Sequence, residues 1–239
     1  MIALILAGGL GTRLSPHTDE VPKPLLEVNG KAILAHQIET LHELGISKIV
    51  IVTGHLNDKI EDFVLSNFPE KNIVFAHNSE YKDSKPAYGI IASLPHLDED
   101  SIYLNGDVFY DKEILKMIAE DTRGSITAIQ KTPWDEEQVN VILKEGSIIE
   151  CISKKISESE NHGEFIGVTK LTKDFIDKIK NTVENEGAEN FRYSFAIDLL
   201  NHVTNNQNIP IYGLDVTELK AIEIDTPEDY IEAKEKFNE

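Results

Sequence analysis

Glycines and fixed positive charges are concentrated near the start of the chain. An apolar run, residues 2–6, leads directly into three glycines between positions 8 and 11, and Arg13 and Lys23 follow. Because glycine has no Cβ, such a loop brings backbone N–H groups close to a ligand, where they can bind an anion. The side chains of Arg13 and Lys23 would form ion pairs with the same anion. This segment predicts a binding site for a triphosphate.

The spacing of these glycines excludes the two common phosphate-binding loops. The dinucleotide pattern G-x-G-x-x-G needs a third glycine where this chain has Leu14. The P-loop needs Lys followed by Ser or Thr, and neither pair follows the glycines at the required interval. What remains, L-A-G-G-L-G-T-R-L followed by P-K-P-L, resembles the signature of nucleotidyltransferases, which join a nucleoside monophosphate to a phosphorylated small molecule.

The resemblance implies roles for the residues of these motifs. Arg13 would contact the departing β- and γ-phosphates and Lys23 the α-phosphate that is attacked, so these two are the expected catalytic residues. Fixed cations at both places would stabilise the charge that develops in an in-line transition state. The expected nucleotide-binding residues of the motifs are Leu6, Ala7, Gly8, Gly9, Gly11, Thr12 and Gly106.

Two aspartates lie at the ends of predicted strands. Asp107 follows residues 101–104 and a glycine, and Asp225 precedes a helix start with a capping hydroxyl and a proline. Spacing alone does not pair them. The resemblance does, because Gly106-Asp107 and E-I-D-T-P-E-D-Y match family motifs whose aspartates hold the catalytic Mg²⁺. A cation would also help to draw a triphosphate to a protein of net charge −19.

The second half of the chain carries signals for the other substrate. The segment G-E-F-I-G, residues 163–167, resembles the phosphocholine and phosphonate cytidylyltransferase branch. In that superfamily an upstream lysine holds the acceptor phosphate, and we select Lys154 rather than Lys155 for this role. Glu164 could meet a cationic group of the acceptor. Asn78 and Ser84 lie in a loop where the family reads its base. CTP is the expected nucleotide, since the glutamine-bearing pattern of the thymidylyl and uridylyl sugar enzymes is not evident.

The expected reaction joins CMP from CTP, or the monophosphate of another NTP, to a small phosphorylated or phosphonate acceptor and releases pyrophosphate. By resemblance the acceptors would be phosphocholine, 2-aminoethylphosphonate or an amino-acid phosphate such as phosphoglutamine, which suggests capsule or surface polysaccharide biosynthesis. The main alternative is a sugar-1-phosphate nucleotidyltransferase. A glycosyltransferase would normally show Asp-x-Asp after the central strand, where Val108 and Phe109 follow Asp107. A silent regulatory subunit would not need both catalytic cations and both aspartates.

Composition limits the partners. Of 239 residues, 41% are hydrophobic and 27% charged, which is typical of soluble globular proteins. The net charge of −19 argues against nucleic acid and anionic membranes. We see no membrane-spanning run and no secretory signal, and the single Cys151 agrees with a cytoplasmic location. A homo-oligomer is compatible with the sequence, which does not decide the oligomeric state.

Alternating apolar patterns predict the elements that position these residues. Strands at 2–6, 48–52, 73–76 and 101–104 alternate with helices at 32–44, 58–67 and 88–94. We therefore expect one α/β domain over residues 1–239, with a mostly parallel sheet flanked by helices. The family resemblance implies that this is a Rossmann-like, mixed sheet of the nucleotide-diphospho-sugar transferase type. A hairpin around Glu145-Gly146, a helix at 194–204 capped by Ser194 and a C-terminal helix would complete it. Ligands of such sheets bind at the carboxyl ends of the strands.

Overall fold

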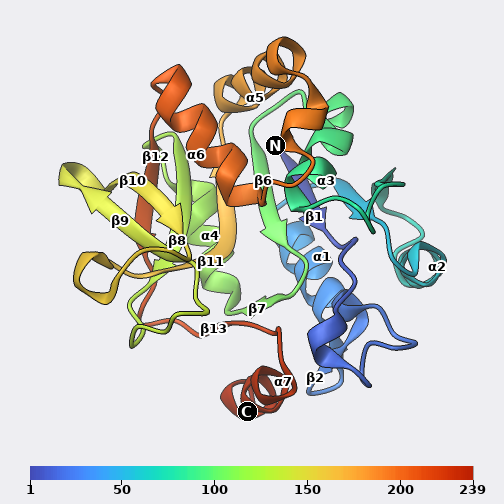
Figure 1. Cartoon of the computed structure of the whole chain (residues 1–239). Helices are drawn as coiled ribbons and strands as arrows, with labels where there is room; N and C mark the ends of the chain where they lie inside the picture. Colours follow the sequence, from blue (N-terminus) through green and yellow to red (C-terminus); the bar gives the residue numbers. More distant parts are fainter. Residues whose placement is uncertain (239) are drawn as a thin grey trace.

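A nine-stranded mixed sheet runs through the centre of the molecule (Figure 1). The structure is a computed structural model and describes residues 1–238. The strand order is β5-β4-β1-β6-β11-β8-β12-β10-β9, and β11 also pairs with β9. The strands are β1 (Ile2–Leu6), β4 (Lys48–Thr53), β5 (Asn72–His77), β6 (Ser101–Asn105), β8 (Ser125–Gln130), β9 (Asn140–Lys144), β10 (Ile148–Ser153), β11 (Glu164–Leu171) and β12 (Ile211–Asp215).

Only part of this sheet is parallel, which corrects the expectation of a mostly parallel one. Strands β5, β4, β1 and β6 run parallel, as does the pair β8–β12. Strand β11 is antiparallel to both β6 and β8, and β10 is antiparallel to β9 and β12. Strand β11 follows the β9–β10 hairpin without a crossover helix, which a parallel connection would need. The α/β class and the predicted hairpin are confirmed.

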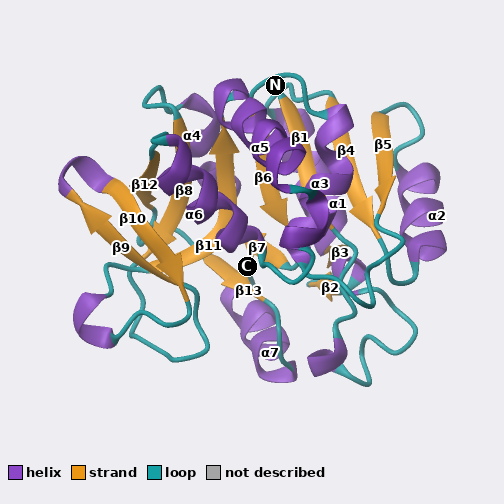
Figure 2. Cartoon of the chain, turned by 45° about the horizontal axis from the view of Figure 1, so that its top comes forward, coloured by secondary structure: helices purple, strands orange, loops and turns teal. Residues whose placement is uncertain are grey.

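Helices cover both faces of the sheet (Figure 2). One face packs against α1, α2 and α4, and the other against α3, α5 and α6, so that each face has its own apolar core. Strand residues alternate between the two cores: Ile2 and Leu4 enter one, and Ala3 and Ile5 the other. The helices are α1 (Ile33–Glu43), α2 (Asn57–Asn67), α3 (Pro86–Ser93), α4 (Lys112–Glu120), α5 (Lys173–Glu186), α6 (Ala196–Gln207) and α7 (Pro227–Lys236).

Two small two-stranded sheets lie at the end of the sheet where β1 and β6 finish. Strand β2 (Glu27–Val28) pairs with β3 (Lys31–Ala32), and β7 (Val108–Tyr110) pairs with β13 (Ala221–Glu223). Helix α7 packs on them through a third apolar cluster that includes Leu14, Ile224 and Tyr230. Strand β13 and helix α7, at the C-terminal end of the chain, therefore pack against the segments that follow β1 and β6.

Of the two helix N-caps predicted from the sequence, Thr226 and Ser194, one is confirmed and one is wrong. At α7 the predicted cap is confirmed: Thr226 Oγ1 accepts from Asp229 N–H, and the Asp229 carboxylate accepts from Thr226 N–H. The Ser194 cap is wrong, because α6 begins at Ala196 and its first turn is closed by Asp198, which accepts from Phe195 N–H at 2.7 Å. Within residues 1–238 every helix is too short or too polar to cross a bilayer.

Candidate active site

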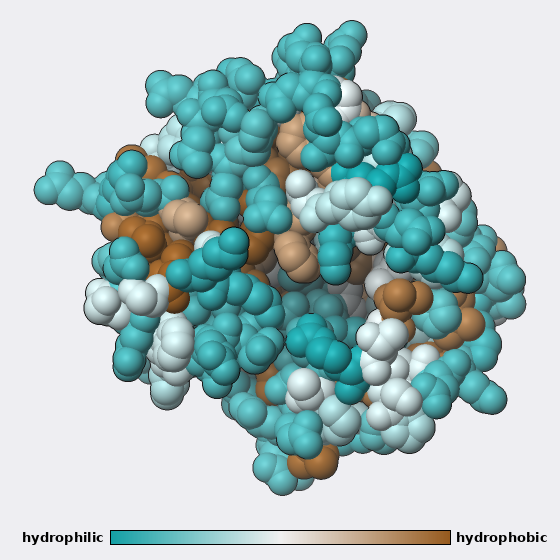
Figure 3. Space-filling view, in the orientation of Figure 1, coloured by the Kyte–Doolittle hydropathy of each residue, from teal (hydrophilic) through white to brown (hydrophobic). Residues whose placement is uncertain are grey.

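A cleft of about 710 Å³ opens at the carboxyl ends of β1 and β6. In the space-filling view the surface is hollowed near its middle, with strongly hydrophilic residues at its lower edge (Figure 3). The loops after β1 and β6, the loop before α3, the end of β10 and the start of α6 contribute to it. Of the residues predicted from the sequence, those that line it are Leu6, Ala7, Gly8, Gly9, Arg13, Lys23, Ser84, Gly106, Asp107, Lys154 and Asp225.

The glycine loop follows β1 directly, and the backbone at its start lies close to the backbone at the ends of β4 and β6. A Cβ on Gly106 would lie 2.4 Å from the carbonyl oxygen of Leu6, and one on Gly8 would lie 3.0 Å from the backbone of Thr53. Gly11 has φ +64°, a conformation that glycine adopts without strain. Gly11 and Thr12 do not line the cleft; they shape the turn, where Thr18 Oγ1 donates to Gly11 O at 2.7 Å.

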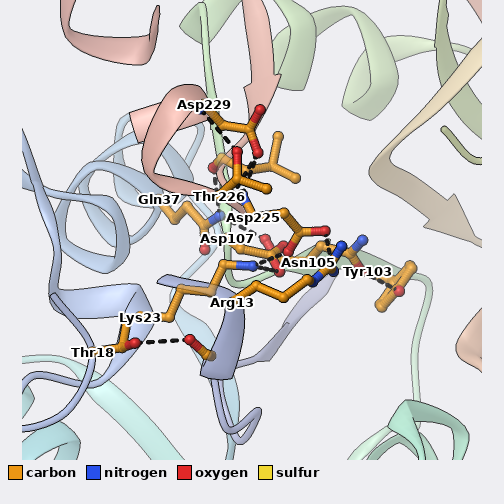
Figure 4. Close-up of polar contacts among 12 residues, drawn as sticks. Arg13, Thr18, Lys23, Gln37, Tyr103, Asn105, Asp107, Asp225, Thr226 and Asp229 are labelled. Carbon is orange, nitrogen blue, oxygen red and sulfur yellow. Dashed lines mark hydrogen bonds and ion pairs between the residues drawn. The ribbon is translucent and has the colours of Figure 1, made fainter. Parts of the chain in front are cut away.

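Three carboxylates gather at the floor of the cleft. Asp107, Glu223 and Asp225 each offer an oxygen atom within 4.8 Å of the others. Strand β13 brings them together because it pairs with β7, so that Ile224 N–H donates to Asp107 O at 3.0 Å. Spacing alone had left Asp107 and Asp225 unpaired, and the geometry now places them side by side (Figure 4).

Both predicted cations reach this cluster. Lys23 Nζ lies 2.7 Å from Asp107 Oδ2 and also hydrogen-bonds Asp225 Oδ1, and Arg13 Nη2 lies 2.5 Å from Asp225 Oδ2. Burial alone would lower the pKa of Lys23, but the charges of Asp107 and Asp225 outweigh it and raise that pKa well above its usual range. Burial likewise opposes ionisation of Asp225, yet Lys23 and Arg13 hold its pKa below the ordinary value. Both groups are charged at neutral pH.

Glu223 is the member of the cluster that we did not expect from the sequence. Its burial, with the nearby charges of Asp107 and Asp225, raises its pKa to about 8. A signal for it was present, because Glu223 and Asp225 are two positions apart at a strand end, whereas the intervening Ile224 is fully buried in the opposite direction. Alternation therefore puts both carboxylates on one side.

The donor set suits a hard divalent cation. All the acidic groups are carboxylates, the ligands that Mg²⁺ prefers. Asp107 Oδ1 is buried and has no hydrogen-bond partner within residues 1–238, so one oxygen remains for a cation to satisfy. The cluster thus fits the expected magnesium ion, and the residues that could hold it are Asp107, Glu223 and Asp225.

The opposite wall of the cleft comes from the β9–β10 hairpin and from α6. Lys154 and Lys155 follow β10 and line the cleft, and Lys154 Nζ lies 3.7 Å from Glu137. Glu164 does not line it. Its carboxylate accepts from Thr132 Oγ1 at 3.1 Å, and burial raises its pKa. The geometry therefore gives the expected contact between Glu164 and an acceptor no support.

The loop before α3 is ordered by its own polar groups. Asn78 uses both ends of its amide inside the loop, donating to Ser84 Oγ at 3.1 Å and accepting from Glu80 N–H. Asn78 therefore holds the loop, whereas Ser84 faces the cleft. The loop is also joined to the segment before α6, since Lys85 N–H donates to Arg192 O.

Several lining residues were missed. Tyr81 comes from the loop before α3, and the exposed rings of Tyr193 and Phe195 come from the segment before α6. Asn105, the last residue of β6, also lines the cleft. Aromatic and amide side chains in loops carry no pattern of spacing that marks them as ligand-binding, so tertiary structure was needed to find them.

Comparison with known proteins identifies relatives of the whole chain. A family profile described as "Nucleotidyl transferase" matches residues 2–141. The UTP–glucose-1-phosphate uridylyltransferase AglF of Haloferax volcanii is 30% identical over 245 residues, which cover all of this chain and 97% of AglF. The choline-phosphate cytidylyltransferase of Streptococcus pneumoniae is 41% identical over 90 residues, or 38% of each chain.

Solved structures share the fold. The inositol-1-phosphate CTP transferase from T. maritima superposes with a TM-score of 0.81 at 23% identity, over all of this chain and 96% of that one. At this identity the match establishes the architecture and leaves the substrates open.

Proposed function

The chain belongs to the nucleotidyl transferase family, and we propose that it is a Mg²⁺-dependent cytidylyltransferase acting on CTP and a small phosphorylated or phosphonate acceptor. The observation that carries the proposal is the presence of two cationic sites across one cleft. Arg13 and Lys23 lie on the wall built after β1, and Lys154 lies on the wall built after β10. Arg13 and Lys23 suit the triphosphate of a nucleotide, and Lys154 suits the phosphate group of a second substrate.

The proposed reaction needs little from the protein beyond positioning and charge. An oxygen of the acceptor phosphate attacks the α-phosphorus of CTP and forms a new P–O bond. The bond from that phosphorus to the bridging oxygen breaks, and pyrophosphate leaves with the electron pair. Lys23 would stabilise charge on the α-phosphate and Arg13 on the departing phosphates. The attacking group is already an anion, so the proposal gives no residue the role of general base.

Asp107 and Asp225 would hold the magnesium ion, with Glu223 beside them. When bound, the ion supplies positive charge to the phosphate oxygens. In the structure Lys23 bridges the two aspartates, so a cation and Lys23 would share these carboxylates.

Cytidine as the base rests on the segment 163–167 and on similarity to a cytidylyltransferase over 90 residues. The candidate acceptors are phosphocholine, 2-aminoethylphosphonate and an amino-acid phosphate. The uridylyltransferase that matches the chain over its full length favours a second candidate, a sugar-1-phosphate uridylyltransferase. The two candidates share the phosphate chemistry and differ only in the base and in the acceptor.

A matrix assay separates these candidates. Each NTP is incubated with Mg²⁺ and each acceptor phosphate, glucose 1-phosphate included, and pyrophosphate release is followed. We expect turnover with CTP and one of the three acceptors. Turnover only with UTP and a sugar 1-phosphate would replace the first candidate by the second, and no pyrophosphate with any pair would contradict both.

Two variants test the residue assignments. Asp225→Asn should lower kcat by about 10³-fold or more, because it removes a metal ligand beside the reacting phosphate. Lys154→Ala should raise the KM of the acceptor roughly 10- to 100-fold, as expected for a lost charged hydrogen bond, with the KM of the nucleotide unchanged. Lys144→Ala is the matched control, since this exposed lysine of the same hairpin pairs with Glu150 outside the cleft. An equal effect of both lysine variants would remove the Lys154 assignment.

A further inference from the structure

Asn105 lines the same cleft as the carboxylate cluster and as Lys154 and Phe165, which we call the acceptor wall. It is the last residue of β6, directly before Gly106-Asp107, and its side chain points to the same face of the sheet as that of Tyr103. Figure 4 shows both side chains beside the pair of Asp107 and Asp225. Both residues line the cleft.

The orientation of the Asn105 amide is fixed by a buried hydroxyl. Tyr103 is 1% exposed and its hydroxyl donates to Asn105 Oδ1. Burial raises the pKa of Tyr103 far above its usual range, and the charges of Asp107 and Glu223 raise it further, so the hydroxyl stays protonated. Because the amide oxygen is the acceptor for this hydroxyl, the amide nitrogen must point the other way.

Hydrogen bonds also fix the backbone around Asn105. Gln37 Nε2 donates to Asn105 O at 2.9 Å and to Val108 O at 3.0 Å, and Gly106 N–H donates to Leu6 O. Space for the side chain comes from β11, where Gly167 has φ +69° and a Cβ would lie 2.5 Å from Asn105 Nδ2. The register of β11 against β8 also shifts between Phe165 and Thr169.

The Nδ2 group is left as a donor at the cleft. In the described part of the chain no protein atom accepts a hydrogen bond from it, although Asn105 Oδ1 and the Asn105 backbone carbonyl each accept one. Its neighbour across the sheet is β11, on the side of the acceptor wall formed by Lys154 and Phe165. A neutral N–H donor near three carboxylates can bind a phosphate oxygen without being drawn into an ion pair with them.

We infer that the Asn105 carboxamide donates a hydrogen bond to a phosphate oxygen of the acceptor, and that Tyr103 is a positioning residue that keeps the amide in this orientation. The inference rests on the proposed function, because it requires a phosphorylated acceptor. It adds an uncharged donor to the site of Lys154, so that the attacking phosphate is held from two sides. Two contacts define the direction of attack, which a single lysine on a flexible stem would not do.

Steady-state kinetics with both substrates varied test this assignment. Asn105→Ala should raise the acceptor KM roughly 10- to 100-fold and leave the nucleotide KM within about twofold, as for a lost hydrogen bond to a charged group. Asn105→Asp keeps the shape and the acceptor for Tyr103 but has no N–H, so it should impair acceptor binding at least as much. Normal acceptor KM values in both variants, or a rise in the nucleotide KM instead, would overturn the inference.

The role of Tyr103 is tested by a double-mutant cycle. Tyr103→Phe should raise the acceptor KM about three- to tenfold in the wild type and leave it unchanged in the Asn105→Ala background, because the hydroxyl acts only through the amide. Tyr110→Phe is the matched control: its hydroxyl is equally buried and has no hydrogen-bond partner among residues 1–238. Additive effects of the two cleft variants would contradict the positioning role.

Failure of the proposed function has a different signature. If the wild type releases no pyrophosphate with any nucleotide and acceptor, the reaction assignment is wrong. If the wild type turns over and the Asn105 variants have its acceptor KM, only the role of Asn105 is wrong.

Discussion

Replacing Lys23 by methionine removes the ammonium group that lies between two carboxylates of the cleft. Methionine keeps most of the length and packing of the side chain, so charge is the main change. The Lys23 side chain is 11% exposed, against 25% for Asp107 and 23% for Asp225. The variant therefore leaves three clustered carboxyl groups, including Glu223, and among the described residues Arg13 still forms an ion pair with the cluster.

The size of the effect follows from this partial burial. Removing one partner of a fully buried ion pair costs about 3–5 kcal/mol. The carboxylates here are about a quarter exposed and Arg13 still pairs with Asp225 at 2.5 Å, so we expect a loss of about 2–3 kcal/mol. For a chain of this length each 1 kcal/mol lowers Tm by about 2–4 °C. Lys23→Met should therefore lower Tm by about 4–12 °C in the presence of EDTA.

Magnesium should reverse much of this loss. In the wild type a cation must share Asp107 and Asp225 with Lys23, whereas in the variant it meets unpaired carboxylates. At a concentration about 100-fold above Kd, binding to the folded state alone adds about 2.7 kcal/mol. Mg²⁺ should therefore raise Tm more in Lys23→Met than in the wild type, although the variant should have little activity.

Thermal unfolding with EDTA and over a series of Mg²⁺ concentrations measures both quantities. Lys31→Met is the control, because Lys31 forms an exposed pair with Glu39 at 2.5 Å that should be worth no more than about 1 kcal/mol. Equal losses of stability by the two lysine variants in EDTA would contradict the expected cost of removing Lys23. An equal rise of Tm with Mg²⁺ in Lys23→Met and in the wild type would contradict the sharing of the carboxylates.

Two further predictions concern stability. Gly106→Ala should lower the free energy of unfolding by about 1–3 kcal/mol, because its Cβ would lie 2.4 Å from Leu6 O. Gly9→Ala, with no atom within 4 Å of the added carbon, should change it by less than about 0.5 kcal/mol; urea unfolding of both variants checks the pair, and equal losses would contradict it. Burial lowers the pKa of His36 below 6.5, despite its hydrogen bond to Tyr110 O, so the unfolded chain binds more protons just below pH 6.5. Stability should therefore fall as the pH drops below 6.5, and His36→Gln should flatten that part of the urea-midpoint profile between pH 5 and 7.

The sequence predicted much of the local structure because local patterns carry it. Alternating apolar runs located the main strands, and the Thr226 cap located the start of α7. The same patterns do not encode strand direction or neighbours, which depend on contacts between distant segments. The antiparallel entry of β11 between β6 and β8 was therefore missed.

For the candidate site too, some features follow from the sequence and others only from the tertiary structure. By itself the sequence determined the glycine loop, the two cations and the acidic strand ends, because each is a short motif whose residues act together. Only the tertiary structure decided that Lys23 bridges Asp107 and Asp225, that Glu223 joins them, and that Glu164 turns to Thr132 and away from the cleft. It also decided that Asn105 presents an amide N–H to the cleft. These facts depend on how β7, β11 and β13 pack around the end of β6, and no spacing along the chain specifies such packing.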